Sequence, residues 1–181
     1  MNEEFEVLKT VSGRLEQAGI PYMLTGSVAS NFYTIPRMTR DIDIVIEAKR
    51  EDANRLLALF QKDFYIDRET ILEAIEIQGM FNIIHNQHVV KVDFIIRKQS
   101  AYRELEFTRR RKISLSDFQI SIVSLEDLIL SKLAWAKDSL SEMQLGDVRK
   151  LLSDAAPLDS HYLQQWVKTL ELQTVYEKVK P

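Results

Sequence analysis

The chain has 181 residues, of which 45% are hydrophobic and 28% are charged. This composition is too apolar for a disordered chain and too mixed for a fibrous one, and the length suits one domain with or without an appended helical lobe. The absence of cysteine excludes disulfides, cysteine nucleophiles and thiolate metal sites. A formal net charge of −3 gives no global electrostatic case for nucleic-acid binding.

The first residues and the hydropathy pattern indicate where the protein works. The chain starts MNEEFE, which is acidic where a secretory signal is basic and then apolar. No apolar run approaches the ~18 residues that a membrane span needs. We therefore expect a cytoplasmic protein with no membrane partner, and the lack of cysteine fits a reducing compartment.

Helices and strands are predicted to alternate up to about residue 123. Helical spacing of apolar residues predicts a first helix over 3–18 that stops at Gly19. The elements expected next are a strand over 22–25, a helix over 28–33, a strand over 41–47, a helix over 50–62, a short strand within 63–67, a hairpin of strands over 80–86 and 89–96, and a strand over 118–123.

The pattern becomes helical from Ser124 onward. Residues 124–127 (SLED) resemble a capping box with Asp127 in place of the usual Glu. Helices are expected over 125–138, 142–153, 159–169 and 171–178. The predicted fold class is α+β, with a core domain over 1–123 and a helical C-terminal region over 124–181 packed on that core.

Asp41 and Asp43 are the strongest chemical signal. On a strand, residues i and i+2 point to the same face, with α-carbons about 6.5–7 Å apart. Two ionised carboxylates at this spacing repel each other unless a cation lies between them. Mg²⁺ prefers one or two carboxylates together with substrate phosphates and water. The alternative interpretation is an exposed edge or a turn start with no ligand.

A third aspartate strengthens the metal interpretation. Asp93 is the only acid in the apolar run 89–96, where burying a carboxylate is costly unless it meets a cation. Three carboxylates from two neighbouring strands suit a two-metal phosphoryl-transfer site, with ions about 3.5–4 Å apart. Gly26 and Ser27 lie between a strand and a helix, where a glycine lets the backbone approach a phosphate.

These motifs together resemble the DNA polymerase β-like nucleotidyltransferase superfamily. The resemblance rests on residues 24–27 (LTGS), 39–44 (TRDIDI) and 92–94 (VDF). It implies a mixed sheet flanked by helices and a Gly-Ser turn, Gly26-Ser27, that holds a nucleoside triphosphate. It also implies that Asp41, Asp43 and Asp93 bind two Mg²⁺ ions and form the catalytic centre. Mn²⁺ is the alternative ion.

Within this superfamily the chain is most similar to the AbiEii/AbiGii-type group, which includes nucleotidyltransferase toxins. The likeness rests on residues 126–132 (EDLILSK) and 146–149 (GDVR), and it implies nucleotide-binding roles for Lys132 and Asp147. Lys132 lies on an apolar helical stripe, so it either extends to solvent or meets an anion. Asp147 either orients Lys132, binds a substrate hydroxyl or forms an ordinary salt bridge.

The basic segment, residues 97–112, carries seven Lys or Arg against two Glu, while the rest of the chain has a net charge of −8. Its Arg109–Arg111 run could grip an RNA backbone, although a solvated face is the commoner meaning of such a run. Arg37, Thr39 and Arg40, just before Asp41, either touch phosphate or balance the aspartate charges.

The expected function is Mg²⁺-dependent transfer of a nucleoside monophosphate from an NTP to an acceptor. RNA, above all tRNA, is the first acceptor considered, in a toxin-like role that implies a neutralising antitoxin partner. The alternatives are a small-molecule acceptor of the antibiotic type, or a catalytically silent nucleotide-binding protein on the same fold.

Overall fold

A computed structural model of the chain describes residues 3–39, 41–115, 117–139, 141–154 and 157–180. The described residues form two compact units. The first unit runs to Val28 and resumes from Met38 to Ile122, and the second comprises Ala29–Arg37 and the residues from Val123 onward.

The first unit is built on a mixed sheet of seven strands within the described residues. The strands lie in the order β3-β4-β5-β2-β1-β7-β6, which makes β5, β2 and β1 central. β2 is parallel to β5 and β1 is parallel to β7, whereas the other pairs are antiparallel. The strands are β1 (Tyr22–Thr25), β2 (Asp41–Ile46), β3 (Phe64–Tyr65), β4 (Met80–His85), β5 (Lys91–Ile96), β6 (Arg111–Leu115) and β7 (Phe118–Ile122).

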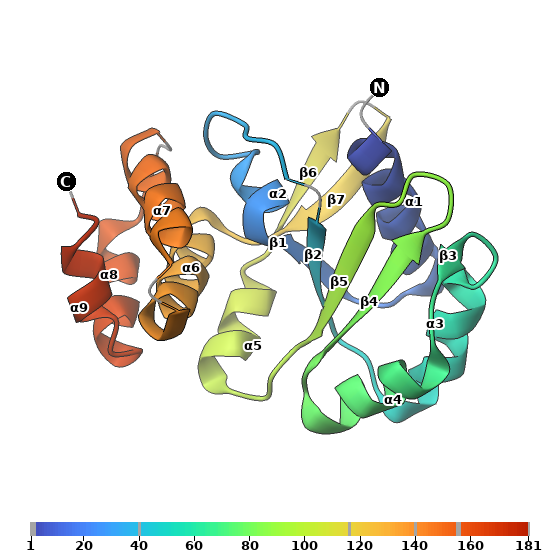
Figure 1. The fold of residues 1–181 in the computed structure, drawn as a ribbon. Helices are drawn as coiled ribbons and strands as arrows, with labels where there is room; N and C mark the ends of the chain where they lie inside the picture. The colour runs from blue at the N-terminus through green and yellow to red at the C-terminus, as the bar shows by residue number, and fades with distance from the viewer. Residues whose placement is uncertain (1–2, 40, 116, 140, 155–156, 181) are drawn as a thin grey trace. The chain divides into compact units, whose positions relative to one another are not determined.

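Helices cover the apolar face of this sheet. The helices of this unit are α1 (Glu3–Ala18), α3 (Ala53–Phe60), which follows the 3-10 turn η1 (Arg50–Asp52), α4 (Arg68–Ile77) and α5 (Ala101–Thr108); the short α2 (Gly26–Ser30) starts here. Figure 1 shows α1, α3 and α4 grouped on one side of the strands, and α4 contacts β4 and β5. The alternate residues Ile42, Ile44 and Ile46 of β2 are fully buried, and burying each such side chain contributes about 1.5–3 kcal/mol.

The second unit is helical in its described part. Its helices are α6 (Leu125–Ser139), α7 (Glu142–Asp154), α8 (Ser160–Thr169) and α9 (Gln173–Glu177), and α6 packs against the other three. At the start of α6, the Ser124 hydroxyl accepts a hydrogen bond from the Asp127 backbone N–H at 3.4 Å and donates to the Asp127 carboxylate at 2.6 Å. This is the N-terminal cap that the sequence predicts, with the fully buried Asp127 also accepting from the Tyr162 hydroxyl.

The expected α+β class is confirmed, and most predicted elements lie within two residues of their observed bounds. α2 differs, because it begins at Gly26 and ends at Ser30. The helix expected over 50–62 consists of η1 and α3. None of the helices in the described ranges combines the length and apolar character needed to cross a membrane.

Two segments hold elements that the sequence patterns did not predict. α4 is capped at its start by Asp67, whose side chain accepts a hydrogen bond from the Thr70 N–H. The helix buries only Ile71 and Ala74, so its apolar stripe is narrow. The basic segment contains α5 and the start of β6, which is an edge strand paired with β7 in the described part of the sheet. Edge strands carry charged side chains and lack a clear apolar alternation, which hides them from periodicity.

Candidate functional site

The structure brings Asp41, Asp43 and Asp93 to one face of two adjacent central strands. Asp43 of β2 pairs in register with Asp93 of β5, and Asp41 pairs with Lys91. Because strand side chains alternate between faces, all four side chains share the face opposite the buried isoleucines of β2. The carboxylate cluster, Asp41, Asp43 and Asp93, is therefore produced by the parallel pairing of β2 with β5.

Lys91 supplies the counter-charge of the carboxylate cluster. Its ammonium lies 2.8 Å from Asp93 Oδ2 and 3.5 Å from Asp41 Oδ2. The hydrogen bond to Asp93 and the charges of Asp93 and Asp41 raise the pKa of Lys91 above its ordinary value, against the opposing effect of burial. Lys91 has no role among the sequence predictions, although its position two residues before Asp93 on a strand is a signal that could have found it.

The Gly26-Ser27 turn lies beside Asp43. Thr25 pairs with Asp43 across β1 and β2, and Gly26 follows it with a left-handed φ of +67°. A Cβ built on Gly26 would lie 2.0 Å from Asp43 Oδ2, so the carboxylate fills the space that the missing side chain leaves. The predicted phosphate-binding turn and the predicted metal ligand are thus direct neighbours.

The donor chemistry of the carboxylate cluster fits a divalent ion. Carboxylate oxygens are the ligands that Mg²⁺ prefers, and the Lys91 ammonium already stands as a cation between Asp41 and Asp93. In the described part of the chain, no three acidic or histidine side chains are gathered closely enough to hold a metal ion by themselves. A divalent ion at this cluster would therefore need further ligands, such as substrate phosphates and water.

Lys132 and Asp147 meet each other in the second unit. The Lys132 ammonium donates to Asp147 Oδ2 at 2.8 Å and to Gln144 Oε1 at 3.1 Å. Lys132 is only 4% exposed and Asp147 only 6%, so Lys132 does not extend to solvent. Asp147 thus forms a buried ion pair with Lys132.

Arg37 adds a second cation to Asp147. Its Nε and Nη2 each donate to one carboxylate oxygen at 3.0 Å, which is the bidentate geometry that guanidinium groups favour. Burial raises the pKa of Asp147, but the hydrogen bonds and charges of Arg37 and Lys132 lower it by more, so it lies below its ordinary value. Arg37 and Lys132 therefore share the Asp147 carboxylate.

Asn31 fixes the backbone of Arg37. The Asn31 amide donates to the Arg37 carbonyl at 2.9 Å and accepts from the Arg37 N–H at 3.0 Å. These two hydrogen bonds fix the backbone of the residue that carries the guanidinium, Arg37. Thr39 is half-buried in the first unit, and Arg40 lies outside the described residues.

Carboxylates neutralise part of the basic segment. Among the described residues, Arg97 forms ion pairs with Glu47 and Glu104, Arg103 with Glu106, and Lys112 with Glu16. The Arg110 guanidinium lies 4.2 Å from the centre of the Phe107 ring and donates to the Phe107 carbonyl. Glu47 and Glu16, which lie outside the segment, therefore offset part of its net charge.

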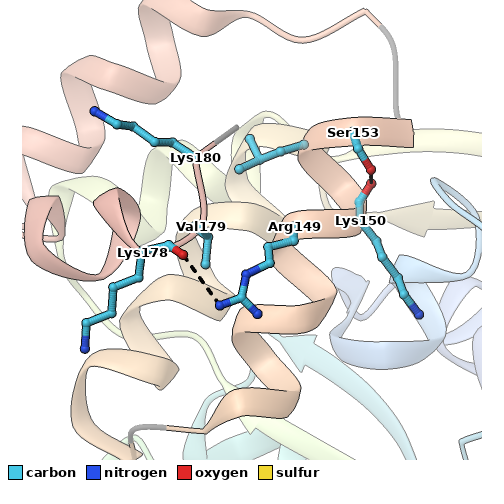
Figure 2. Close-up of a pocket in the computed structure, with 7 residues that line it drawn as sticks. Arg149, Lys150, Ser153, Lys178, Val179 and Lys180 are labelled. Atoms are coloured by element: carbon cyan, nitrogen blue, oxygen red, sulfur yellow. Dashed lines mark hydrogen bonds between the residues drawn. The ribbon is translucent and has the colours of Figure 1, made fainter.

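A separate hollow of about 360 Å³ lies in the second unit, between α7 and the residues after α9. Its lining consists of Arg149, Lys150, Leu152, Ser153, Lys178, Val179 and Lys180. Figure 2 shows the three lysine ammonium groups pointing in different directions, and Arg149 donating to the Lys178 carbonyl. The lining residues that the structure describes include no Asp or Glu, and their cations do not converge on one point.

No protein-family model matches the sequence, and no curated protein sequence matches it at a significant level. Solved structures do match. An antigenic nucleotidyltransferase-like protein from Paracoccidioides brasiliensis is 16% identical with a TM-score of 0.58, covering 97% of this chain and 92% of that one. The lincosamide antibiotic adenylyltransferase LnuA, bound to lincomycin, is 15% identical with a TM-score of 0.56, covering 86% of this chain and 99% of that one.

A third match is ANT(2'')-Ia in complex with adenylyl-2''-tobramycin, which is 12% identical with a TM-score of 0.57 and covers 97% of this chain and 99% of that one. At such identities the likeness establishes the fold alone. The predicted fold is confirmed: the chain has a nucleotidyltransferase-like α+β fold. The likeness to the AbiEii/AbiGii-type group stays a prediction.

Proposed function

We propose that this protein transfers a nucleoside monophosphate from an NTP to an acceptor hydroxyl in a Mg²⁺-dependent reaction. The observation that carries the proposal is the in-register pairing of Asp43 with Asp93, with Asp41 on the same face, in a nucleotidyltransferase-like fold. A module that only binds nucleotide has no need of three carboxylates on one face, since each adds repulsion.

The reaction has one bond-forming and one bond-breaking event. The acceptor oxygen forms a bond to the α-phosphorus while the bond from that phosphorus to the bridging oxygen breaks, and pyrophosphate leaves. Bound Mg²⁺ would neutralise the phosphate charge and lower the pKa of the acceptor hydroxyl. Asp41 and Asp43 would hold both ions, and the more buried Asp93 would serve the acceptor side and take the hydroxyl proton.

The other assigned residues bind phosphate. Gly26 has no side chain to obstruct the approach of the triphosphate, and Ser27 follows it with a hydroxyl and a backbone N–H. Lys132, paired with Asp147, is likewise assigned to nucleotide binding. Arg37 is added to this set, because it shares the Asp147 carboxylate with Lys132. Positioning and charge neutralisation would then supply most of the rate enhancement.

The acceptor in this proposal is either RNA or a small molecule. RNA, in a toxin-like role with an antitoxin partner, depends on the positive charge of the basic segment. The ion pairs of Arg97 with Glu47 and of Lys112 with Glu16 offset part of that charge and favour a small molecule instead. A net charge of −3 also suits a cationic acceptor, and two of the similar solved structures are an antibiotic adenylyltransferase and a complex with an adenylylated antibiotic.

The test is a transfer assay with each of the four α-labelled NTPs and Mg²⁺. Total cellular RNA and a panel of hydroxylated cationic antibiotics are offered as acceptors in separate reactions. We expect Asp43→Asn to lose at least about hundredfold in rate with an unchanged melting temperature, because the ion loses a charged ligand. Asp138→Asn, which changes an exposed aspartate of α6, is the matched control and should keep wild-type activity.

The outcomes separate the three functions. Label on an antibiotic supports the small-molecule enzyme. Label on RNA that falls with salt, and falls further when Arg109, Arg110 and Arg111 are changed to Gln, supports the RNA enzyme, since phosphate contacts release counterions. NTP binding without transfer to either acceptor class would leave the silent nucleotide-binding protein, and full activity of Asp43→Asn would refute the assignment of the carboxylate cluster.

A further inference from the structure

We propose that Lys91 is a built-in counter-ion of the carboxylate cluster, whose ammonium holds Asp41 and Asp93 together and competes with the divalent ion for them. The inference rests on the proposed function, because it concerns the metal that this function requires. It makes Lys91 a positioning residue that sets how tightly the ion binds. Nothing in the proposed transfer step needs the lysine itself.

The contacts place Lys91 between two of the predicted metal ligands. Its ammonium lies 2.8 Å from Asp93 Oδ2 and 3.5 Å from Asp41 Oδ2, so one cation serves carboxylates from two strands. Lys91 pairs in register with Asp41 and precedes Asp93 by two residues on the same face of β5. The backbone position of Lys91, beside both carboxylates, is therefore fixed by the sheet.

The same contacts account for the lack of a ready metal-binding group in the described residues. A divalent ion bridging Asp41 and Asp93 would have to come within a few ångströms of the ammonium, and like charges at that distance disfavour each other strongly. As long as Lys91 pairs with Asp41 and Asp93, both carboxylates are engaged by the ammonium and are not arranged around a divalent ion.

The exposed fractions of the three side chains indicate how a divalent ion could displace the Lys91 ammonium. The Asp93 side chain is 9% exposed and stays in place, whereas that of Lys91 is 38% exposed and that of Asp41 53%. The flexible four-carbon stem of lysine lets the ammonium move into solvent when an ion arrives. Binding of the ion is thus coupled to release of Lys91, and the apo protein avoids the repulsion of uncompensated carboxylates.

The experiment measures Mn²⁺ binding to the full chain by calorimetric titration, without nucleotide or acceptor. The test variant is Lys91→Met, which removes the charge and keeps the length of the side chain. We expect it to bind Mn²⁺ more tightly than wild type by on the order of tenfold, because a competing charge has been removed. We expect Lys91→Arg, which keeps the charge, to remain near the wild-type affinity.

Lys112→Met is the matched control for net charge. Like Lys91, Lys112 lies on a strand and pairs with a carboxylate, that of Glu16 at 3.5 Å. Its strand, β6, is at the sheet edge. Its loss lowers the protein charge equally but should leave Mn²⁺ affinity unchanged. A second readout is the melting temperature: Lys91→Met should be less stable than wild type without metal and should gain more from added Mn²⁺.

The results distinguish the inference from the proposed function. Equal or weaker Mn²⁺ binding by Lys91→Met, with binding by the wild type intact, overturns the role of Lys91 and leaves the metal-dependent function standing. No Mn²⁺ binding by wild type or by either Lys91 variant, even with NTP added, overturns the metal site and the inference with it. If Lys91→Met does not fold, Lys91→Gln removes the same charge and is judged by the same comparison.

Discussion

Gly26 controls the position of Asp43, because its missing side chain leaves the space that the Asp43 carboxylate fills. At this position glycine meets two separate demands, a left-handed φ of +67° and a close approach of Asp43 Oδ2. The position of Asp43 therefore depends on the lack of a Cβ at residue 26.

Gly26→Ala should lower both the activity and the stability of the protein. The left-handed conformation costs an alanine about 1–2 kcal/mol, and the new Cβ would push Asp43 out of its position. We expect transfer activity to fall more than about tenfold, a 1.4 kcal/mol loss of transition-state stabilisation, through displacement of a metal ligand. Urea unfolding and the transfer assay measure the two effects.

Gly13→Ala is the matched control for this substitution. A Cβ on Gly13 meets nothing within 4 Å, and the residue lies inside α1, where alanine is favoured over glycine by about 1 kcal/mol. It should leave activity unchanged and raise the free energy of unfolding. If Gly26→Ala is as active as Gly13→Ala, Asp43 does not depend on the space at Gly26.

At the scale of elements, the Asp147 carboxylate links α6, α7 and the segment before β2. It accepts from Lys132 of α6 and from Arg37, and it belongs to α7 itself. Removing one member of a buried ion pair leaves an uncompensated charge, which typically costs about 3–5 kcal/mol. Asp147→Asn should therefore destabilise the protein at neutral pH.

This destabilisation should depend on pH in a definite direction. The pKa of Asp147 lies below its ordinary value of 3.8 in the folded protein, so folding favours the ionised carboxylate. Its stabilising effect is complete above that value and is lost as the pH falls through the lower, folded pKa. The difference in free energy of unfolding between wild type and Asp147→Asn should be constant near neutrality and shrink below about pH 4.

Urea unfolding at a series of pH values measures this difference. Asp138→Asn, an exposed aspartate of the neighbouring helix α6, should show no such trend. Other carboxylates with lowered pKa values, such as Asp63 beside Arg14, titrate in both proteins and cancel in the difference. A difference that stayed constant down to pH 2.5 would show that Asp147 is not stabilised as a carboxylate.

At the scale of the whole molecule, binding of substrate should be visible as stability. A ligand that binds only the folded state stabilises it by about 2.7 kcal/mol at a concentration a hundred times its dissociation constant. For a chain of this length each kcal/mol raises the melting temperature by about 2–4 °C. We therefore expect Mg²⁺ with the correct NTP to raise it by several degrees, about 5–10 °C.

The measurement is a thermal shift with each of the four NTPs, with Mg²⁺ or with a chelator. The chelator should abolish most of the shift, and the variant with both Asp41 and Asp43 changed to Asn should show little. The NTP that gives the largest shift identifies the donor base. An equal shift in the double variant would place the nucleotide away from the carboxylate cluster.

Much of the fold could be predicted from the sequence because it is local. The capped start of α6 at Ser124, the alternation of Ile42, Ile44 and Ile46, and the apolar spacing of α1 each depend on residues close together in the chain. α4 and β6 were missed because a narrow apolar stripe and an exposed edge leave little periodic signal.

The sequence by itself predicted the α+β fold class, which is confirmed, and singled out the three aspartates and the Gly26-Ser27 turn as candidate site residues, since residue type and short spacing carry these signals. Only the tertiary structure decided which charges meet. Asp43 and Asp93 are fifty residues apart and become neighbours through the register of two parallel strands, which brings Lys91 against Asp41 as well. Ion pairs between distant segments depend on such long-range pairing, and local periodicity carries no information about it.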